Sequence, residues 1–393
     1  MQKLEKLLGR RELAPYLSDE QFEFRESVHK ALAQHATPDY LRHADEEKRF
    51  PIELVDLMAR QGWFAVNLPE EYGGVGGVMD MIGMLEVMGY HSSTLARYWN
   101  INVNMVGGAL VQLATPQMKQ DLLPRLAEGK TYFSFALSEN GSGSDAASLK
   151  TNAVQEGDHF RVNGTKMWIT GAVQAHNILM ACRTEKGEGK HEGISLLLVP
   201  NPTPGLEVRP INLLGGHMVR SCELNLIDAK VPADRLVGDL HRGWRQLMGV
   251  LAKERIALGA IVVGAAQAAL DLAIEYTNER KQFGRSISSF QTINHRLVEL
   301  QTQVDCARLL TYRGAALLAA GHDANVESAQ AKFFAGDTYM KVALEGLQVM
   351  GANGYSMEYA MQRHFREAKV FQILGGTGEI LRNIVARSLV QGA

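Results

Sequence analysis

The stretch from Thr131 to Thr170, TYFSFALSENGSGSDAASLKTNAVQEGDHFRVNGTKMWIT, decides the fold class, because helix-forming sequence gives way to strand-forming sequence there. Aromatic and β-branched residues alternate with polar ones in this stretch, which is typical of half-buried strands. Similar runs follow, separated by Gly, Pro and Asn: NILMACRT, GISLLLVP, LEVRPI and CELNLIDAKVP. Asn163-Gly164 lies between two strand-like runs at the spacing of a type I′ hairpin. We therefore expect an antiparallel β domain that ends near Gly243.

Helical sequence lies on both sides of this domain. Ser18 is followed three residues later by Gln21, which predicts a helix N-cap before an amphipathic run. Helical periodicity returns after Trp244 and includes long amphipathic runs over 291–320 and 326–350. The expected fold is a multi-domain α+β protein, with an N-terminal helical domain at 1–130, a central β domain at 131–243 and a C-terminal helical bundle at 244–393.

Composition excludes several classes of protein. The 393 residues are 46% hydrophobic and 21% charged, which excludes a disordered chain. A net charge of -2 argues against a nucleic-acid binder. The apolar run IALGAIVVGAAQAAL starts at Ile256, with Ile256, Ala260, Val263, Ala266, Leu270 and Ile274 expected on one helix face, and is shorter than the ~20 residues that cross a bilayer. The charged N-terminus resembles ordinary structure rather than a secretory signal, and three widely spaced cysteines indicate a reducing, cytoplasmic location.

The Gly/Ser-rich motif ALSENGSGSDAAS is the first candidate for a binding site. Gly141-x-Gly143-x-x-Ala146 satisfies a loose dinucleotide pattern, but strand-like sequence follows where a Rossmann helix would be needed, so NAD binding is rejected. What remains is a tight loop whose backbone N–H groups and serine hydroxyls can bind an anion such as a cofactor pyrophosphate. A plain Gly/Ser turn is the alternative interpretation.

Three further motifs each allow a structural and a functional interpretation. Trp168 and Thr170 are expected on one face of a regular strand, either as a core pair or beside a flavin ring. The segment YTNERKQFGR places cations in the last turn of a helix and then a Gly stop. Gly375-Gly376 breaks the chain before Thr377, a possible helix N-cap, and leaves free N–H groups that can polarise a carbonyl or close an interhelix turn. No histidine spacing indicates a metal site.

Taken together, these motifs closely resemble those of the acyl-CoA dehydrogenase family over essentially the whole chain. The similar segments are NLPEEYGG, LSENGSGSDAAS, KMWITG, ERKQFG and QVMGANGYSMEY through RHFREA. The resemblance implies FAD as cofactor, the three-domain order expected above and a homotetramer without nucleic acid or membrane insertion. This chain departs from the family's usual residues in two places, with Ala352 where Gly is frequent and Glu367 where Asp is frequent.

The resemblance also implies site residues, carried over position by position. Those that would hold FAD, some of them from the adjacent subunit, are Phe135, Ala136, Leu137, Ser138, Gly143, Ser144, Trp168, Ile169, Thr170, Arg280, Phe283, Gln291, Gln348, Val349, Met350, Gly351, Ala352, Thr377, Gly378 and Glu379. Those that would contact substrate are Ser144, Lys253, Arg255, Gly375 and Gly376.

The catalytic base has moved relative to many family members. The family's glutamate before Gly-Thr is replaced here by Gly375, in ILGGTGE, which cannot take a proton. A minority of the family, isovaleryl-CoA dehydrogenase among them, carries the base at the position of Glu254 in VLAKERIALGA. Glu254 lies at the mouth of a strongly apolar helix, where desolvation would raise its pKa. A solvated Glu-Arg flank is the alternative interpretation.

The implied reaction is oxidation of an acyl-CoA to a trans-2-enoyl thioester in fatty-acid metabolism, with electrons passed to an electron-transfer flavoprotein. Three alternatives stay open. HMVRSC and the Glu254/Gly375 pairing are similar to the crotonobetainyl-CoA reductase-like branch, which suggests an enoyl-CoA reductase. The thioester could be bound to an acyl carrier protein instead of CoA. A flavin monooxygenase on the same scaffold is the third.

Overall fold

A computed structural model describes residues 13–390, so the expectation for the extreme N-terminus lies outside the described residues. The first domain is helical, and Ser18 caps its first long helix in a capping box with Gln21, as predicted. Its elements are α3 (Asp19–His35), α4 (Pro38–Glu46), α5 (Ile52–Arg60), α6 (Val78–His91), α7 (Ser93–Trp99), the π-helix η3 (Asn100–Gly107), α8 (Gly108–Leu113) and α9 (Pro116–Ala127).

The central domain is an eight-stranded sheet in the order β6-β7-β3-β2-β4-β5-β8, with β1 beside β4. The strands are β1 (Phe133–Ala136), β2 (Asn152–Glu156), β3 (His159–Thr170), β4 (Asn177–Arg183), β5 (Ile194–Pro200), β6 (Leu206–Pro210), β7 (Ser221–Pro232) and β8 (Leu236–Val237). The expected antiparallel pairing holds for most of the sheet. It is wrong for β1, which runs parallel to β4, and for the one residue pair at which β2 meets β4.

The predicted hairpin at Asn163-Gly164 is also wrong. Both residues lie inside β3, and the turn is at Gly157-Asp158, between Glu156 and its partner His159. Gly164 sits at a register shift between β3 and β7, and a Cβ there would lie 2.6 Å from Thr151 Cα. Glycine is therefore required at position 164 for close packing and a bulge rather than for a hairpin.

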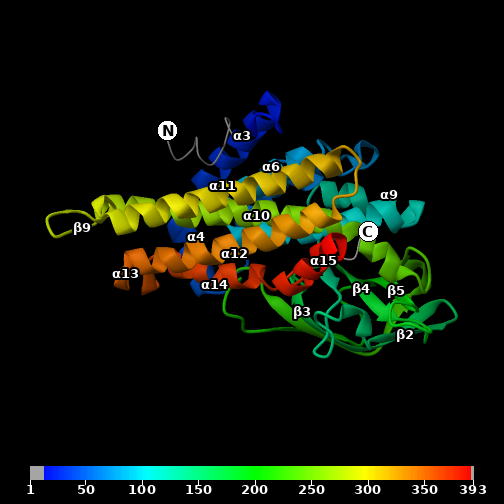
Figure 1. Ribbon diagram of the computed structural model, residues 1–393. Coiled ribbons are helices and arrows are strands. Elements are labelled where there is room, and N and C mark those ends of the chain that lie inside the picture. The colour runs from blue at the N-terminus through cyan, green and yellow to red at the C-terminus, as the bar shows by residue number, and fades with distance from the viewer. Residues whose placement is uncertain (1–12, 391–393) are drawn as a thin grey trace.

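The C-terminal domain is built on three long helices that lie alongside one another (Figure 1). Its elements are α10 (Gly243–Glu279), β9 (Lys281–Gln282), β10 (Arg285–Ser286), α11 (Gln291–Ala319), α12 (Asn325–Met350), α13 (Ala352–Tyr355), α14 (Met361–Phe371) and α15 (Gly378–Val390). Within the described chain α10 is the one helix long and apolar enough to cross a membrane, but 89% of its most apolar window is buried inside the protein. It is buried on nearly all sides from Glu254 to Ala273, because α6, α11 and α12 all pack against it.

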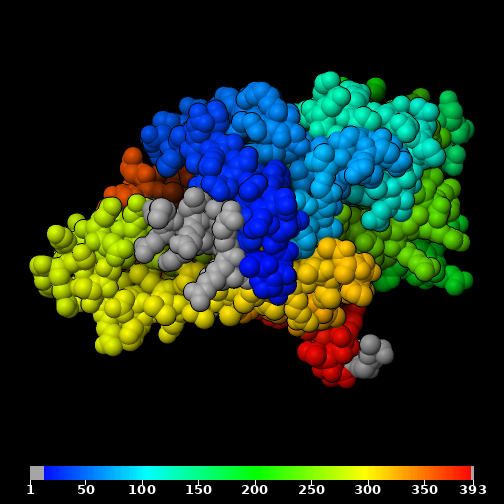
Figure 2. All heavy atoms as spheres, turned by 90° about the horizontal axis from the view of Figure 1, so that it is seen from above, coloured from blue at the N-terminus to red at the C-terminus, as the bar shows by residue number. Residues whose placement is uncertain are grey.

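The segment after α10 differs from the predicted helix end. Arg280 is the C-cap and Lys281 begins a strand, so neither cation lies in the last helical turn. Phe283 and Gly284, with φ of +53° and +77°, form the two-residue turn between β9 and β10. Positive φ at both central residues is the type I′ geometry that closes hairpins. Gly284 therefore serves this turn, and the hairpin projects beyond the end of the bundle (Figure 2).

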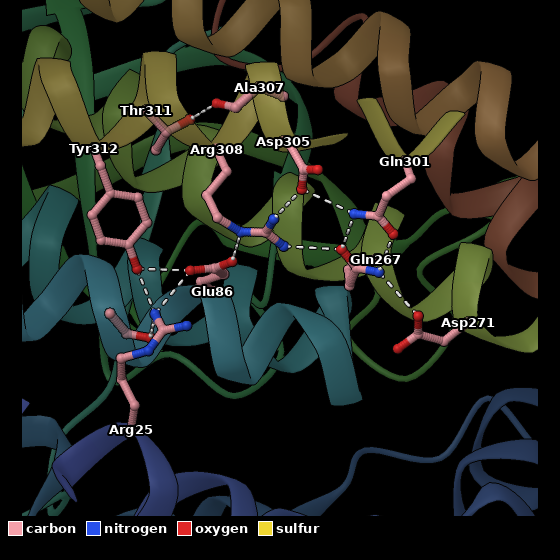
Figure 3. A network of polar contacts seen from close by, with 11 residues as sticks. Arg25, Glu86, Gln267, Asp271, Gln301, Asp305, Ala307, Arg308, Thr311 and Tyr312 are labelled. Carbon is pink, nitrogen blue, oxygen red and sulfur yellow. Dashed lines mark hydrogen bonds and ion pairs between the residues drawn. The ribbon is translucent and has the colours of Figure 1, made fainter. Parts of the chain in front are cut away.

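A buried polar network joins the first domain to the bundle (Figure 3). Glu86 on α6 forms ion pairs with Arg25 on α3 and Arg308 on α11, each with an N–O distance of 2.8 Å. The Tyr312 hydroxyl donates to the same carboxylate over 2.7 Å. Four side chains from three helices thus interact with one another in the interior, which fixes how these helices pack.

Candidate active site

Glu254 lies in the first third of α10, and its side chain is buried, at 6% exposure. Within the described part of the chain, its Oε2 atom has no hydrogen-bond partner. Burial raises the pKa of Glu254 to about 7 and outweighs the opposing effect of the Lys332 and Arg255 cations. A carboxyl group that titrates near neutral pH in a buried site is suited to take up and release protons.

The Glu254 carboxylate lies directly against Gly375, in the turn that follows α14. A Cβ built on Gly375 would be 3.3 Å from Oε2 and 3.5 Å from Oε1 of Glu254, and it would clash with Leu258. Gly375 has a φ of +64° and Gly376 of +96°, conformations that favour glycine. The fold therefore brings together the glutamate and the glycine that the sequence pairs, and the space beside Gly375 is filled by Glu254 and Leu258.

The loop from Gly375 to Thr377 is held from both sides. The Lys332 ammonium on α12 donates a hydrogen bond to the Gly376 carbonyl over 2.7 Å. Thr377 caps α15 by accepting from the Ile380 N–H at 3.3 Å, as its position predicts. No described residue accepts a hydrogen bond from the N–H of Gly375 or Gly376, so both donors are free for a substrate oxygen.

Lys332 is the functional candidate that sequence reasoning missed. Its side chain is 1% exposed, and burial lowers its pKa to about 8. A signal existed in the sequence, because Lys332 lies on the same helix face as Ser328, Ala335 and Tyr339, small or largely apolar residues that are buried. A lysine on such a stripe is seldom fully buried without a partner.

Arg255 and Lys253 flank the base without pairing with it in a hydrogen bond. Arg255 donates to Asn325 Oδ1 over 2.8 Å, toward the start of α12. Burial lowers the pKa of Lys253 to about 8. Their substrate contacts stay predictions.

The Gly/Ser loop is a tight turn rather than a helix start. The backbone groups of Glu139 and Ser142 exchange hydrogen bonds of 3.1 and 3.2 Å, which fits the rejection of a Rossmann helix. The Glu139 carboxylate is anchored by the Lys166 ammonium at 2.8 Å. The Ser142 hydroxyl is buried and has no partner in the described chain, and the space around Gly141 and Gly143 is open. An unpartnered buried hydroxyl beside open glycines fits an anionic ligand such as the FAD pyrophosphate.

Trp168 departs from regular strand geometry. It lies at a register shift between β3 and β7 with a φ of +68°, a strained conformation for an aromatic residue. Its ring is 53% exposed, while Ile169 is buried beneath the sheet. The Thr170 hydroxyl lies 3.1 Å from Ser221 Oγ, and Ser134 Oγ donates to the Thr170 carbonyl over 2.7 Å. An exposed indole held in a strained backbone conformation offers a flat face against which a planar ring can pack. Trp168 and Thr170 therefore suit the flavin of FAD.

Except for Thr377, Gly378 and Glu379, which follow Gly376 directly, the remaining predicted cofactor residues fall into a second, distant group. Arg280, Phe283 and Gln291 lie around the β9–β10 hairpin, and Gln348 to Ala352 lie at the end of α12 (Figure 1). Phe283 is 93% exposed. From Glu254 to Arg280 along α10 the distance is roughly 39 Å at 1.5 Å per residue. One chain therefore does not bring the two groups together at a single cofactor.

Comparison with known proteins identifies the family. The profiles for the acyl-CoA dehydrogenase N-terminal, middle and C-terminal domains match residues 18–130, 134–229 and 241–390. The chain belongs to the acyl-CoA dehydrogenase family. It is therefore an FAD-binding oxidoreductase, a flavin-dependent dehydrogenase or reductase of acyl-CoA thioesters.

The relatives cover nearly the whole chain. Probable acyl-CoA dehydrogenase YngJ of Bacillus subtilis is 35% identical over 95% of this chain and 99% of the relative. The caffeyl-CoA reductase-Etf complex subunit CarC of Acetobacterium woodii is 30% identical over 96% and 100%. Butyryl-CoA dehydrogenase from Megasphaera elsdenii has a TM-score of 0.91 and 31% identity, covering 95% of this chain and 99% of that one. The FAD complex of PigA has a TM-score of 0.90 and 25% identity, covering 95% and 98%.

One family departure has a clear setting in the structure. Glu367 on α14 accepts hydrogen bonds from the hydroxyls of Ser93 and Thr94 on α7, the latter over 3.0 Å. The longer glutamate thus has its own partners in the first domain. Nothing in the structure explains Ala352 in place of glycine.

Proposed function

We propose that this protein is an acyl-CoA dehydrogenase that converts a saturated acyl thioester into the trans-2-enoyl thioester, with Glu254 as the catalytic base. The observation that carries the proposal is the buried Glu254 carboxylate, which lies against the glycine that replaces the family's usual base. Its pKa of about 7 supports proton abstraction at neutral pH.

Each group in the site has a proposed task. Glu254 removes a proton from Cα of the substrate. The Gly375 N–H donates to the thioester oxygen as negative charge develops there. Trp168 and Thr170 hold the isoalloxazine, while Ser142, Ser144 and the backbone from Phe135 to Ser144 bind the pyrophosphate. When bound, FAD supplies the acceptor for the β-hydride. Because Glu254 is buried, water has little access to the carboxyl group that takes up the proton.

We propose that the distant group of residues serves the FAD of an adjacent subunit in a homotetramer. Arg280, Phe283 and Gln291 lie at or beside the β9–β10 hairpin, at the far end of α10 from Glu254 of the same chain, and all three are exposed. Their exposure supports an intersubunit role, as does the length of α10. Thr377 caps α15, and Gly378 and Glu379 begin this helix close to Gly375. These three residues would hold the FAD that is bound beside Glu254 of the same chain.

We propose an electron-transfer flavoprotein as the redox partner and the cytoplasm as the location. The name of the Acetobacterium woodii relative includes an Etf complex, which supports the partner. The three free cysteines support the location, because cytosolic proteins rarely contain disulfides.

A reductase acting on an enoyl thioester is the second candidate. Two relatives support it by name: CarC and the 3-(aryl)acrylate reductase of Clostridium sporogenes, which is 31% identical over 95% of this chain. The same base would then return a proton to Cα. A carrier-protein thioester has support in the prolyl acyl carrier protein oxidase AnaB, at 27% identity and a TM-score of 0.90. The retained base argues against a monooxygenase.

The test is an anaerobic titration of the FAD-loaded enzyme with saturated thioesters that differ in chain length, branching and carrier. A dehydrogenase loses its visible flavin absorbance with at least one of them. The contradicting result is a flavin that no saturated thioester bleaches but that enoyl thioesters reoxidise after chemical reduction, which would establish the reductase. Rapid reaction of the reduced flavin with oxygen and a hydroxylated product would instead favour the monooxygenase.

A further inference from the structure

Lys332 is a buried cation beside the reacting groups, and the mechanism above gives it no task. It reaches from the middle of α12 to the Gly376 carbonyl, 2.7 Å away, and its side chain is 1% exposed. Within the described chain, this is the one hydrogen bond that its ammonium donates, although the group carries three N–H donors. Burying a charged lysine costs free energy, so we expect a lysine at this buried position to have a function in the site.

The Gly375-Gly376 segment, to which Lys332 donates its hydrogen bond, has little conformational preference of its own. Gly375 and Gly376 both have positive φ, and glycine has wide conformational freedom. Their N–H groups have no partner among the described residues, so neither anchors the loop. The Gly376 carbonyl bond to Lys332 and the Thr377 cap on α15 are therefore what orients these donors.

The charged groups around Lys332 include Glu254, so Lys332 also acts on the proposed base electrostatically. Glu254, Arg255 and Asp337 all act on it, and Asp337 is shared with Arg382 on α15 and Gln372 after α14. Arg255 is directed to Asn325. Lys332 is the stronger of the two cations in lowering the pKa of Glu254.

Resting on the proposed function, we propose that Lys332 is a positioning residue of the reaction. It orients the Gly375-Gly376 donors toward the thioester oxygen and favours the ionised form of Glu254. Both effects reach the substrate through another group, so Lys332 itself takes no proton from it.

The experiment compares the FAD-loaded wild type with Lys332→Met, which keeps an unbranched stem without the charge, and Lys332→Arg, which keeps the charge and a donor. Lys341→Met, an exposed lysine on the same helix, is the control. The rate of anaerobic flavin reduction by thioester is measured against pH. Infrared difference spectra of the carboxyl group, with Glu254→Gln as blank, follow the protonation of Glu254 independently of turnover.

We expect Lys332→Met to lower the plateau rate by about tenfold or more, which is less than the roughly 10²–10³-fold loss on removing an oxyanion donor, because the Gly375 N–H stays but is less well oriented. Its pH profile and the infrared titration should both move to higher pH, because a cation that favours the carboxylate is gone. Lys332→Arg should restore most of the profile, and Lys341→Met should match the wild type.

Three outcomes would overturn the proposal. One is wild-type rate and profile in Lys332→Met. Another is a rate loss with no movement of the infrared titration. The third is parallel loss of folding or FAD from both Lys332→Met and a Lys332→Gln variant, which would make the residue structural. If wild-type flavin is reduced by no thioester, the proposed function fails first, and the infrared shift alone decides the electrostatic part.

Discussion

At the scale of single residues, the Glu254 carboxylate lies where a side chain at position 375 would begin. The sequence predicts the pair from the vacated base position, but it does not show that Leu258 also fills the vacated space. Leu258 lies one helical turn after Glu254, at i+4, so its side chain lies on the same face of α10. Moving the base back to position 375 therefore requires more than an exchange of two residues.

The exchange Glu254→Gly with Gly375→Glu should restore little flavin reduction relative to Glu254→Gly alone. The new Cβ would clash with Leu258, and glutamate would be strained at a φ of +64° by about 1–2 kcal/mol. Adding Leu258→Ala should raise the rate at least several-fold over the double variant, because the clash is gone. The measurement is the anaerobic reduction rate by thioester, and a double variant as fast as the triple would show that Leu258 is no obstacle.

At the scale of elements, the buried network of Figure 3 fixes α3, α6 and α11 against one another. Glu86 is fully buried. Desolvation would raise its pKa, but the Arg25 and Arg308 charges outweigh this and hold the pKa below its ordinary value of 4.5. A carboxyl group whose pKa falls on folding stabilises the native state above its unfolded pKa and loses that contribution as pH falls through the folded one. Acid should therefore weaken this joint only below pH 4.5.

Glu86→Gln should lower the free energy of unfolding by about 3–5 kcal/mol, because it removes the buried carboxylate that the Arg25 and Arg308 guanidinium groups share. Glu128→Gln is the control, since the exposed Glu128–Lys130 pair should contribute at most about 1 kcal/mol. Denaturant unfolding at neutral pH measures both. Equal, small losses in the two variants would show that the network is not a stabilising joint.

Sequence patterns predicted the long helices well, because α11 and α12 have strong periodicity and clear breaks at both ends. Asn163-Gly164 misled the prediction, since a dipeptide with local turn preference was recruited into a bulge by pairing between β3 and β7. The left-handed Trp168 and the role of Lys332 escaped prediction for a related reason. Both depend on neighbours remote in sequence: β7 for Trp168, and the loop after α14 for Lys332.

At the scale of the whole molecule, the proposed FAD contacts lie at two ends of one elongated chain (Figure 1). The length of α10 separates Arg280 from Glu254 by roughly 39 Å. A complete cofactor site then requires a second chain whose hairpin reaches the first chain's sheet. Assembly and FAD retention should accordingly depend on each other.

Arg280→Ala should weaken FAD retention by roughly tenfold, the scale of a lost charge-assisted contact. Lys281→Ala, the neighbouring cation on β9, should retain FAD as the wild type does. Equilibrium dialysis of the cofactor and light scattering measure both properties. A stable monomer fully loaded with FAD would contradict the intersubunit assignment.

The most direct test of the whole account is the anaerobic reduction of FAD by a saturated thioester in the wild type and in Glu254→Gln, from pH 5 to 9. The account predicts a wild-type rate that rises with pH and levels off above a midpoint near the Glu254 pKa of about 7, because only the ionised carboxylate takes the proton. Glu254→Gln should keep its fold and FAD content while losing about 10³-fold in rate on the plateau above pH 7, and its residual rate should not rise with pH around that midpoint. Reduction of Glu254→Gln at the wild-type rate would contradict Glu254 as the base.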